Sequence, residues 1–342
     1  MENPIQETTD LFRFQITEEQ EEERVDKCIA ALIDSLSRSF IQKMIKEGRV
    51  CINGLPVKAS YQVKAGDDLS FLLPKAQEPD IEPEDIPLDI LYEDSDVLVV
   101  NKPKDMVVHP AAGHYSHTLV NAVLYHCRGQ LSGINGVLRP GIVHRIDKDT
   151  TGSVIVCKND AAHQALAVQF ADHTITRRYR AIVHGVLTDD EGIIDAPIGR
   201  DNADRKKMAV NQVNGKRAVT HYTVLKRFER FTYIECRLET GRTHQLRIHC
   251  QLLGYPILGC DLYGGRELPG TEQAPRLMLH ASELSLTHPF TGEPLTLRAG
   301  FDDVWMRALS QFGWRGLLPL NERVEFADDC GQDEGNKVNP GR

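Results

Sequence analysis

Apolar residues near the start of the chain recur at the spacing expected of two consecutive helices. The first stripe consists of Val25, Cys28, Ile29, Leu32 and Ile33, and the second of Phe40, Ile41, Met44 and Ile45. Residues three and four apart share one face of a helix, so each stripe predicts an amphipathic helix. Ser37 or Ser39 can cap the second helix, and Gly48 can end it.

A short hairpin is predicted directly after the second helix. Val50, Cys51 and Ile52 are typical of a strand, Asn53-Gly54 of a tight turn, and the chain from Val57 of a returning strand. Asp67 and Asp68 close this unit. Prolines at positions 74, 79, 83 and 87 follow among acidic residues. We therefore expect residues 75–87 to form an extended linker at a domain boundary rather than a packed element.

Beyond this linker the pattern mixes strands and helices. Residues 88–92 and 97–101 predict two strands, and residues 119–126 and 161–170 predict helices. Ile234, Cys236 and Leu238 alternate as in a half-buried strand that ends just before Thr240. The mixture predicts an α+β domain built on a large sheet. Residues 319–342 are polar and acidic, and we expect them to be disordered.

The net charge of −9 is unevenly distributed. Residues 1–24 hold eight acids and two bases, and residues 321–342 hold six acids and three bases. In contrast, residues 26–66 carry seven bases against three acids, and residues 200–249 carry twelve against five. Two basic segments separated by an acidic one fit a protein with a local RNA-facing surface, although ordinary solvated faces would give the same pattern.

The eight cysteines are scattered and form none of the close pairs typical of zinc sites. The histidines include no His-Glu-x-x-His pair, so we expect no metal in the chemistry. No apolar run approaches the roughly 18 residues of a membrane span, and the acidic first ten residues do not resemble a secretory signal. We therefore expect a cytoplasmic protein without a membrane partner.

The densest polar segment runs from Gly141 to Gly152 and leads into the apolar strand at residues 154–157. Polar residues just before a buried strand lie at a sheet edge, where a rigid scaffold meets solvent. Asp147 within this segment is a candidate catalyst, although a single Asp is more often a turn former or an ion-pair partner. Kinase, nucleotide-binding and serine-hydrolase motifs are absent from the sequence.

Residues 12–74 resemble the small RNA-binding domain first known from ribosomal protein S-four. The resemblance rests on Arg24-Val25-Asp26, Ser37-Arg38-Ser39, Gly48-Arg49-Val50, Asn53-Gly54 and Val63-Lys64-Ala65-Gly66-Asp67. It implies an RNA-binding domain at residues 12–74, which the acidic segment at residues 1–11 precedes. The phosphate contacts it implies are Arg38, Lys43, Lys46 and Arg49.

We expect residues 88–318 to form the second domain, and residues 88–300 resemble the RNA pseudouridine synthases of the RluA class. The resemblance rests on Asn101-Lys102-Pro103, His109-Pro110, His144-Arg145-Ile146-Asp147-Lys148-Asp149-Thr150-Thr151-Gly152, Arg178-Tyr179-Arg180-Ala181, Lys216 to Tyr222, Leu238 to His249, and Gly259 to Gly265. It implies a mixed, mainly antiparallel sheet with a central cleft. It also implies isomerisation of uridine to pseudouridine in large-subunit (23S) ribosomal RNA or its precursor, by a monomer without any cofactor.

The same resemblance assigns roles to individual residues. Asp147 corresponds to the essential aspartate, which acts as a nucleophile or takes a proton from the sugar. Arg242 corresponds to its basic partner, and Tyr179 to the tyrosine that stacks on the target base. Arg145 would fill the gap left by the extruded uridine, and Leu246 would close the apolar side of the pocket. The remaining substrate contacts that it implies are His144, Thr150, Thr151 and Gly152.

Departures from the family pattern are Ile146, Leu246 and Ser153, and none of them removes a functional group. Two alternatives stay open from the sequence. The chain could be a non-catalytic RNA-binding assembly factor, or a synthase for another ribosomal RNA site or a transfer RNA. The combination of Asp147, Tyr179 and Arg242 argues against the first alternative, because a binding protein needs none of the three together.

Overall fold

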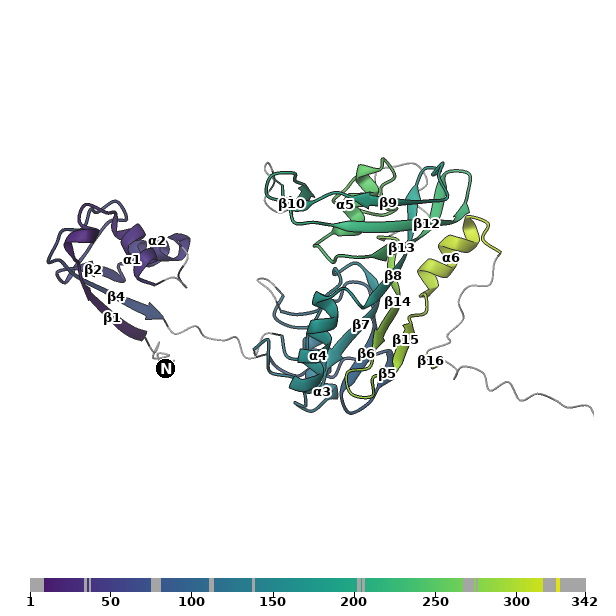
Figure 1. Cartoon of the computed structure of the whole chain (residues 1–342), viewed down its shortest axis with the longest axis horizontal. Helices are drawn as coiled ribbons and strands as arrows, with labels where there is room; N and C mark the ends of the chain where they lie inside the picture. Colours follow the sequence, from purple (N-terminus) through teal and green to yellow (C-terminus); the bar gives the residue numbers. More distant parts are fainter. Residues whose placement is uncertain are drawn as a thin grey trace, which may run out of the picture. The chain divides into compact units, whose positions relative to one another are not determined.

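The computed structural model describes residues 9–315 and 324–326, with gaps at 34–35, 37, 75–80, 111–113, 137–138, 202–203, 205–206, 267–273 and 275. The chain divides into two compact units, residues 1–78 and 79–342 (Figure 1). No helix in the described part of the chain is long and apolar enough to cross a membrane.

The first unit packs two helices against a small antiparallel sheet with the strand order β1-β4-β2-β3. Its elements are β1 (Thr9–Gln15), the 3-10 helix η1 (Glu18–Gln20), α1 (Val25–Leu32), α2 (Arg38–Lys46), β2 (Val50–Ile52), β3 (Leu55–Pro56) and β4 (Asp68–Pro74). Both predicted helices are confirmed. Ser39 lies inside α2 and is therefore not its cap, while Ser37 lies outside the described residues. The returning strand was misplaced, because it consists of residues 55–56 and ends before Val57.

A buried carboxylate, Asp26, joins the two helices of the first unit. Asp26 is fully buried and accepts hydrogen bonds from Arg24, Arg38 and Gln42. These donors hold the pKa of Asp26 well below its usual value, although burial alone would raise it. Asp26 thus ties the start of α1 to α2, because Arg38 and Gln42 both lie on α2.

The predicted linker is only partly extended chain. Its residues 75–80 lie outside the described part, but Ile81 is 6% exposed and belongs to the main core of the second unit. The Glu84 N–H donates to the Asn121 carbonyl, and the Asn121 amide donates to the Glu82 carbonyl. The expectation of an unpacked segment is therefore wrong from residue 81 onward, because the Ile81 side chain and two backbone groups, those of Glu82 and Glu84, contact the second unit there.

The second unit is built on a large mixed sheet, as predicted, and this sheet has ten strands in the described part of the chain. Eight strands follow the order β5-β6-β7-β14-β8-β13-β12-β9, and β15 and β16 extend it from β14. The strands of this sheet are β5 (Ile90–Glu93), β6 (Val97–Lys102), β7 (Thr151–Cys157), β8 (Thr176–His184), β9 (Glu191–Asp195), β12 (Val219–Arg227), β13 (Phe231–Leu238), β14 (Leu279–Thr287), β15 (Pro294–Arg298) and β16 (Val324–Phe326). A separate hairpin pairs β10 (Ile198–Arg200) with β11 (Met208–Val210).

Among the described strands of the large sheet, β7 and β14 form the parallel pair, and the other pairs are antiparallel. The parallel pairing places Gly152 opposite Ala281. Gly152 has a φ of +115°, and a Cβ there would lie 2.2 Å from the Ala281 carbonyl oxygen. Only glycine allows this close approach, so Gly152 joins the two strands at the point where the polar segment of Asp147 enters the sheet.

Helices cover both faces of the sheet (Figure 1). They are α3 (Leu119–His126), α4 (Asp160–Ala171), α5 (Gln245–Leu252) and α6 (Asp303–Gln311). Successive residues of β6 point to opposite faces of the sheet. Leu98 and Val100 belong to the hydrophobic core that contains α3, and Val97 and Val99 belong to the core that contains α4. Trp305 of α6 packs on the β8 and β13 part of the sheet. Residues 324–326, expected to be disordered, instead pair as β16 with β15.

Candidate active site

A pocket of about 300 Å³ lies where the segment before β7 meets β8 and the start of α5. Seven of the residues singled out in the sequence line it, namely His144, Arg145, Asp147, Thr150, Tyr179, Arg242 and Leu246. They come from positions 144 to 246 and meet only because β7, β14, β8 and β13 are consecutive in the sheet. The fold therefore gathers most of the predicted substrate and catalytic residues around one cavity.

The loop that carries Asp147 is fastened to β7 by His144. The His144 Nε2 atom accepts a hydrogen bond of 3.0 Å from the Ile155 N–H, and the ring stacks on Phe170 at 4.9 Å. Burial, and secondarily the nearby Arg177, lowers the pKa of His144 to about 3, so the ring stays neutral and can accept this bond. His144 thus has a structural task at the pocket wall.

The carboxylate of Asp147 is 17% exposed and faces two groups from the start of α5. The Arg247 Nη1 atom lies 3.7 Å from Asp147 Oδ2, and the His244 Nε2 atom lies 3.9 Å from it. No described residue donates a hydrogen bond to this carboxylate. It is therefore held electrostatically at the wall of the pocket.

The predicted pairing of Asp147 with Arg242 is not what the structure contains. Arg242 lines the pocket, but its Nε atom donates to the Arg217 carbonyl at 3.0 Å. Arg247 takes the place beside Asp147 and is 4% exposed. It donates to the Cys260 sulfur at 3.3 Å and lies over the Tyr263 ring. The sequence already offered Arg247 as a candidate, since both arginines belong to the same Gly-Arg-Thr-His-Gln-Leu-Arg run.

Gln245 fixes the turn that leads into α5. Its side-chain oxygen accepts hydrogen bonds from the Thr240 hydroxyl and the Arg242 N–H, at 2.8 and 3.0 Å. Its side-chain nitrogen donates to the Val219 carbonyl and the Thr220 hydroxyl, both at 3.0 Å. The Gln245 side chain thus uses all its donors and acceptors to hold the turn against β12, and this role was not predicted.

His244 is oriented by a relay of hydrogen bonds. The Tyr263 hydroxyl accepts from the Met208 N–H at 3.2 Å, which leaves its proton for His244 Nδ1 at 2.8 Å. The neutral ring then carries its own proton on Nε2, facing Asp147. Burial lowers the pKa of His244 although the Asp147 carboxylate opposes this shift. The sequence did not single out His244 or Tyr263 for this role.

The other predicted residues divide into those in the pocket and those below it. Tyr179 and Leu246 are buried and line it, Arg145 is exposed, and the buried Thr150 hydroxyl has no partner among the described residues. Thr151 does not line this pocket, because its hydroxyl bonds the His280 ring at 2.7 Å. Gly152 is likewise buried within β7. Neither residue lines the pocket, since both join strands, and their contact with substrate stays a prediction.

The four basic residues predicted to contact RNA in the first unit differ in their surroundings. Arg38 pairs with the buried Asp26 at 3.1 Å, which gives it a structural role. Lys43 and Arg49 both face Glu47, at 3.8 and 3.1 Å. Lys46 has no ion pair among the described residues and is exposed on α2.

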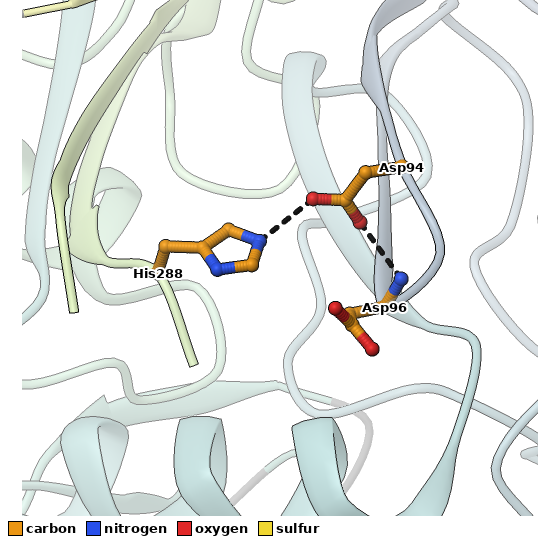
Figure 2. Close-up of side chains that lie close together, drawn as sticks. All are labelled: Asp94, Asp96 and His288. Atoms are coloured by element: carbon orange, nitrogen blue, oxygen red, sulfur yellow. Dashed lines mark hydrogen bonds and ion pairs between the residues drawn. The ribbon is translucent and has the colours of Figure 1, made fainter. Parts of the chain in front are cut away.

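Asp94, Asp96 and His288 form a cluster whose ligand atoms could surround a metal ion (Figure 2). The Asp94 oxygens already accept from the Tyr92 hydroxyl, the His288 ring and two backbone N–H groups. The other nitrogen of His288 accepts from backbone N–H groups, so Nε2 carries the proton and donates to Asp94. The cluster is therefore a cross-link between the β5–β6 turn and the turn after β14.

The sequence matches two family models. One describes RNA pseudouridylate synthases and matches residues 96–252, which contain the pocket residues from Val143 to Arg247. The other describes the S4 domain and matches residues 23–69 of the first unit. The chain belongs to the RNA pseudouridine synthase family and carries an RNA-binding S4 domain.

Individual relatives place it more closely. An uncharacterised RNA pseudouridine synthase of Bacillus subtilis, YlyB, is 51% identical over 283 residues, or 83% of this chain and 92% of the relative. The ribosomal large subunit pseudouridine synthase D of Zymomonas mobilis is 47% identical over 294 residues, with the same coverage. The human RNA pseudouridylate synthase domain containing 1 structure superposes with a TM-score of 0.52 at 28% identity, covering 63% of this chain and 84% of that one.

Proposed function

We propose that this enzyme converts uridine to pseudouridine at defined positions of large-subunit (23S) ribosomal RNA, with Asp147 as its catalytic carboxylate. The observation that carries the proposal is the placement of Asp147 in a pocket of about 300 Å³, 3.7 Å from a buried arginine and without a hydrogen-bond donor among the described residues. Pockets for small ligands begin at about this volume, which suits one extruded nucleoside. The name of the Zymomonas mobilis relative supports the large subunit as target.

The reaction moves one glycosidic bond and transfers no electrons to any other molecule. The bond between N1 and C1′ breaks, the uracil turns, and a bond forms between C5 and C1′. The C5 hydrogen leaves as a proton, and N1 gains one. Asp147 starts the cleavage either as a nucleophile or by taking a proton from the sugar, and both roles require the ionised carboxylate that Arg247 stabilises.

Tyr179 serves this reaction chiefly through its ring. It is buried on β8, and burial raises the pKa of its hydroxyl to about 12. A phenol that keeps its proton is a poor base, so we assign Tyr179 to stacking on the uracil. Leu246 closes the apolar side of the pocket, and the unpartnered Thr150 hydroxyl is available to the nucleoside. The exposed Arg145 is placed to occupy the gap in the RNA.

The S4 domain provides affinity in this proposal rather than chemistry. Lys46 is the first candidate for a phosphate contact, because it has no competing carboxylate among the described residues, whereas Lys43 and Arg49 share Glu47. Arg38 would contact phosphate only with those donors that Asp26 leaves unused.

Release of tritium from C5 tests the proposal. The full chain is incubated with large-subunit RNA labelled at uridine C5, without added metal, nucleotide or redox cofactor. We expect tritium in the solvent, none with Asp147→Asn, and near-normal release with the control Asp149→Asn, whose side chain does not line the pocket. Full retention of label on unmodified RNA would contradict the proposed function, and activity in Asp147→Asn would contradict the assigned residue.

A further inference from the structure

The pocket carries more positive charge than one aspartate requires. Its charged lining consists of Asp147 and four arginines, Arg145, Arg177, Arg242 and Arg247. Arg247 lies beside Asp147, which leaves three guanidinium groups without a carboxylate in the lining. Uracil and ribose are neutral, so the charged groups of an incoming nucleotide are its phosphates. The excess charge is therefore directed at the RNA backbone.

Arg177 is the most firmly held of these three arginines. It lies on β8, two residues before Tyr179, so the two side chains share the pocket face of the strand. One Nη atom donates to the Glu239 carbonyl at 3.2 Å, and the guanidinium lies 5.7 Å from the centre of the Phe170 ring. Phe170 is itself stacked against His144. Arg177 is thus oriented before any ligand arrives.

The donors of Arg177 are only partly satisfied within the described part of the protein. Its Nε atom is buried and lacks a hydrogen-bond partner, and no described acidic side chain pairs with it. Arg178 and Arg180, on the other face of the strand, both pair with Glu235. Burial, with the nearby Arg242, lowers the pKa of Arg177, although Tyr179 opposes this shift.

Gly241 leaves room for the Arg177 guanidinium. A Cβ at position 241 would lie 2.6 Å from the Arg177 Nη1 atom, so only glycine leaves the guanidinium in its present place. Holding a half-buried cation without a counter-ion costs stability, and such a group is more stable once an anion reaches it.

We propose that Arg177 binds the RNA phosphate next to the uridine that enters the pocket, and thereby places the nucleoside over Asp147. This inference rests on the proposed function. A guanidinium offers two parallel N–H groups to a phosphodiester, and such charge-assisted pairs fix orientation as well as add affinity. Arg177 is accordingly a substrate-binding residue, and its loss should weaken substrate use without removing the catalytic carboxylate.

The first test compares Arg177→Gln, Arg177→Lys and the control Arg178→Gln. Arg178 is adjacent in sequence but faces Glu235 and Glu283, which retain Arg180 and Arg298 as partners. kcat/KM for tritium release is measured between 50 and 200 mM salt. We expect Arg177→Gln to lower kcat/KM about 10- to 100-fold and to reduce the log–log salt slope by about 1. Arg177→Lys should retain the slope, and Arg178→Gln should match the wild type.

The second test needs only the wild-type enzyme and RNA whose phosphates have been randomly ethylated. Ethylation removes the phosphate charge, so an ethyl group beside the modified uridine should block binding. The absence of any interfering phosphate within one nucleotide of that uridine would overturn the inference, whatever the variants do. An active wild type together with an Arg177→Gln salt slope equal to that of Arg178→Gln would overturn it as well. A wild type that releases no tritium would instead contradict the proposed function.

Discussion

Replacing Arg247 by Met tests which arginine stabilises Asp147, the proposed catalytic carboxylate. The substitution keeps an apolar chain of similar length but removes the charge that lies 3.7 Å from Asp147. Two unit charges about 4 Å apart interact by about 4 kcal/mol at an effective dielectric constant of about 20. Because Asp147 is 17% exposed, solvent screens part of this energy. We expect a loss of about 2–3 kcal/mol, or a rate about 30- to 150-fold lower.

The assay is single-turnover tritium release with enzyme in excess, which reports the chemical step apart from RNA binding. Arg242→Met is the matched control. It also removes a guanidinium group from the pocket, but this group is hydrogen-bonded to the Arg217 carbonyl rather than placed beside Asp147. We expect Arg242→Met to slow single turnovers by less than about fivefold, because it breaks one hydrogen bond to a neutral group. A larger defect in Arg242→Met than in Arg247→Met, with both variants folded, would refute the assignment of Arg247.

Three further outcomes follow from the packing. Asp26→Asn should destabilise the first unit by about 3 kcal/mol, because the buried Asp26 carboxylate pairs with two arginines. Amide hydrogen exchange in α1 and α2 measures the loss of stability, and unchanged protection of these amides would contradict the prediction. The second unit should lose stability as pH falls from 6.5 to 4, because burial lowers the pKa of His280 to about 4 and the unfolded chain takes up the proton first. This group should change the free energy of unfolding by about 1.4 kcal/mol per pH unit. Denaturant titrations followed by the fluorescence of Trp305 and Trp314 measure the change, and the contribution of this group should be absent in His280→Gln. Removing residues 1–75 should weaken RNA binding and its salt dependence while the tryptophan signal stays native; an unchanged affinity would remove the binding role of the S4 domain.

Local patterns in the sequence were sufficient to locate several elements. The predicted helix at residues 119–126 agrees with α3, and the strand at residues 97–101 agrees with β6 to within one residue. β1 was missed, because its pairing with β4 joins segments more than fifty residues apart. The docking of Ile81 was missed for a similar reason, since its contacts lie in a distant core.

The sequence likewise predicted which residues form the site better than it predicted the contacts among them. The polar segment around Asp147 and the positions of Tyr179 and Leu246 predicted residues that the fold brings into one pocket. The choice between Arg242 and Arg247 could not be made from the sequence, because it depends on the direction in which α5 leaves its turn. The left-handed backbone of His244, with φ of +57°, sets that direction.

The measurement that tests the account most directly is a map of pseudouridines in ribosomal RNA from cells lacking this gene. We expect one or more large-subunit pseudouridines to be missing, to return when the intact gene is restored, and to stay missing when the restored copy carries Asp147→Asn. An unchanged large-subunit pattern in the deleted strain, or full restoration by Asp147→Asn, would contradict the claim that this carboxylate drives uridine isomerisation in that RNA.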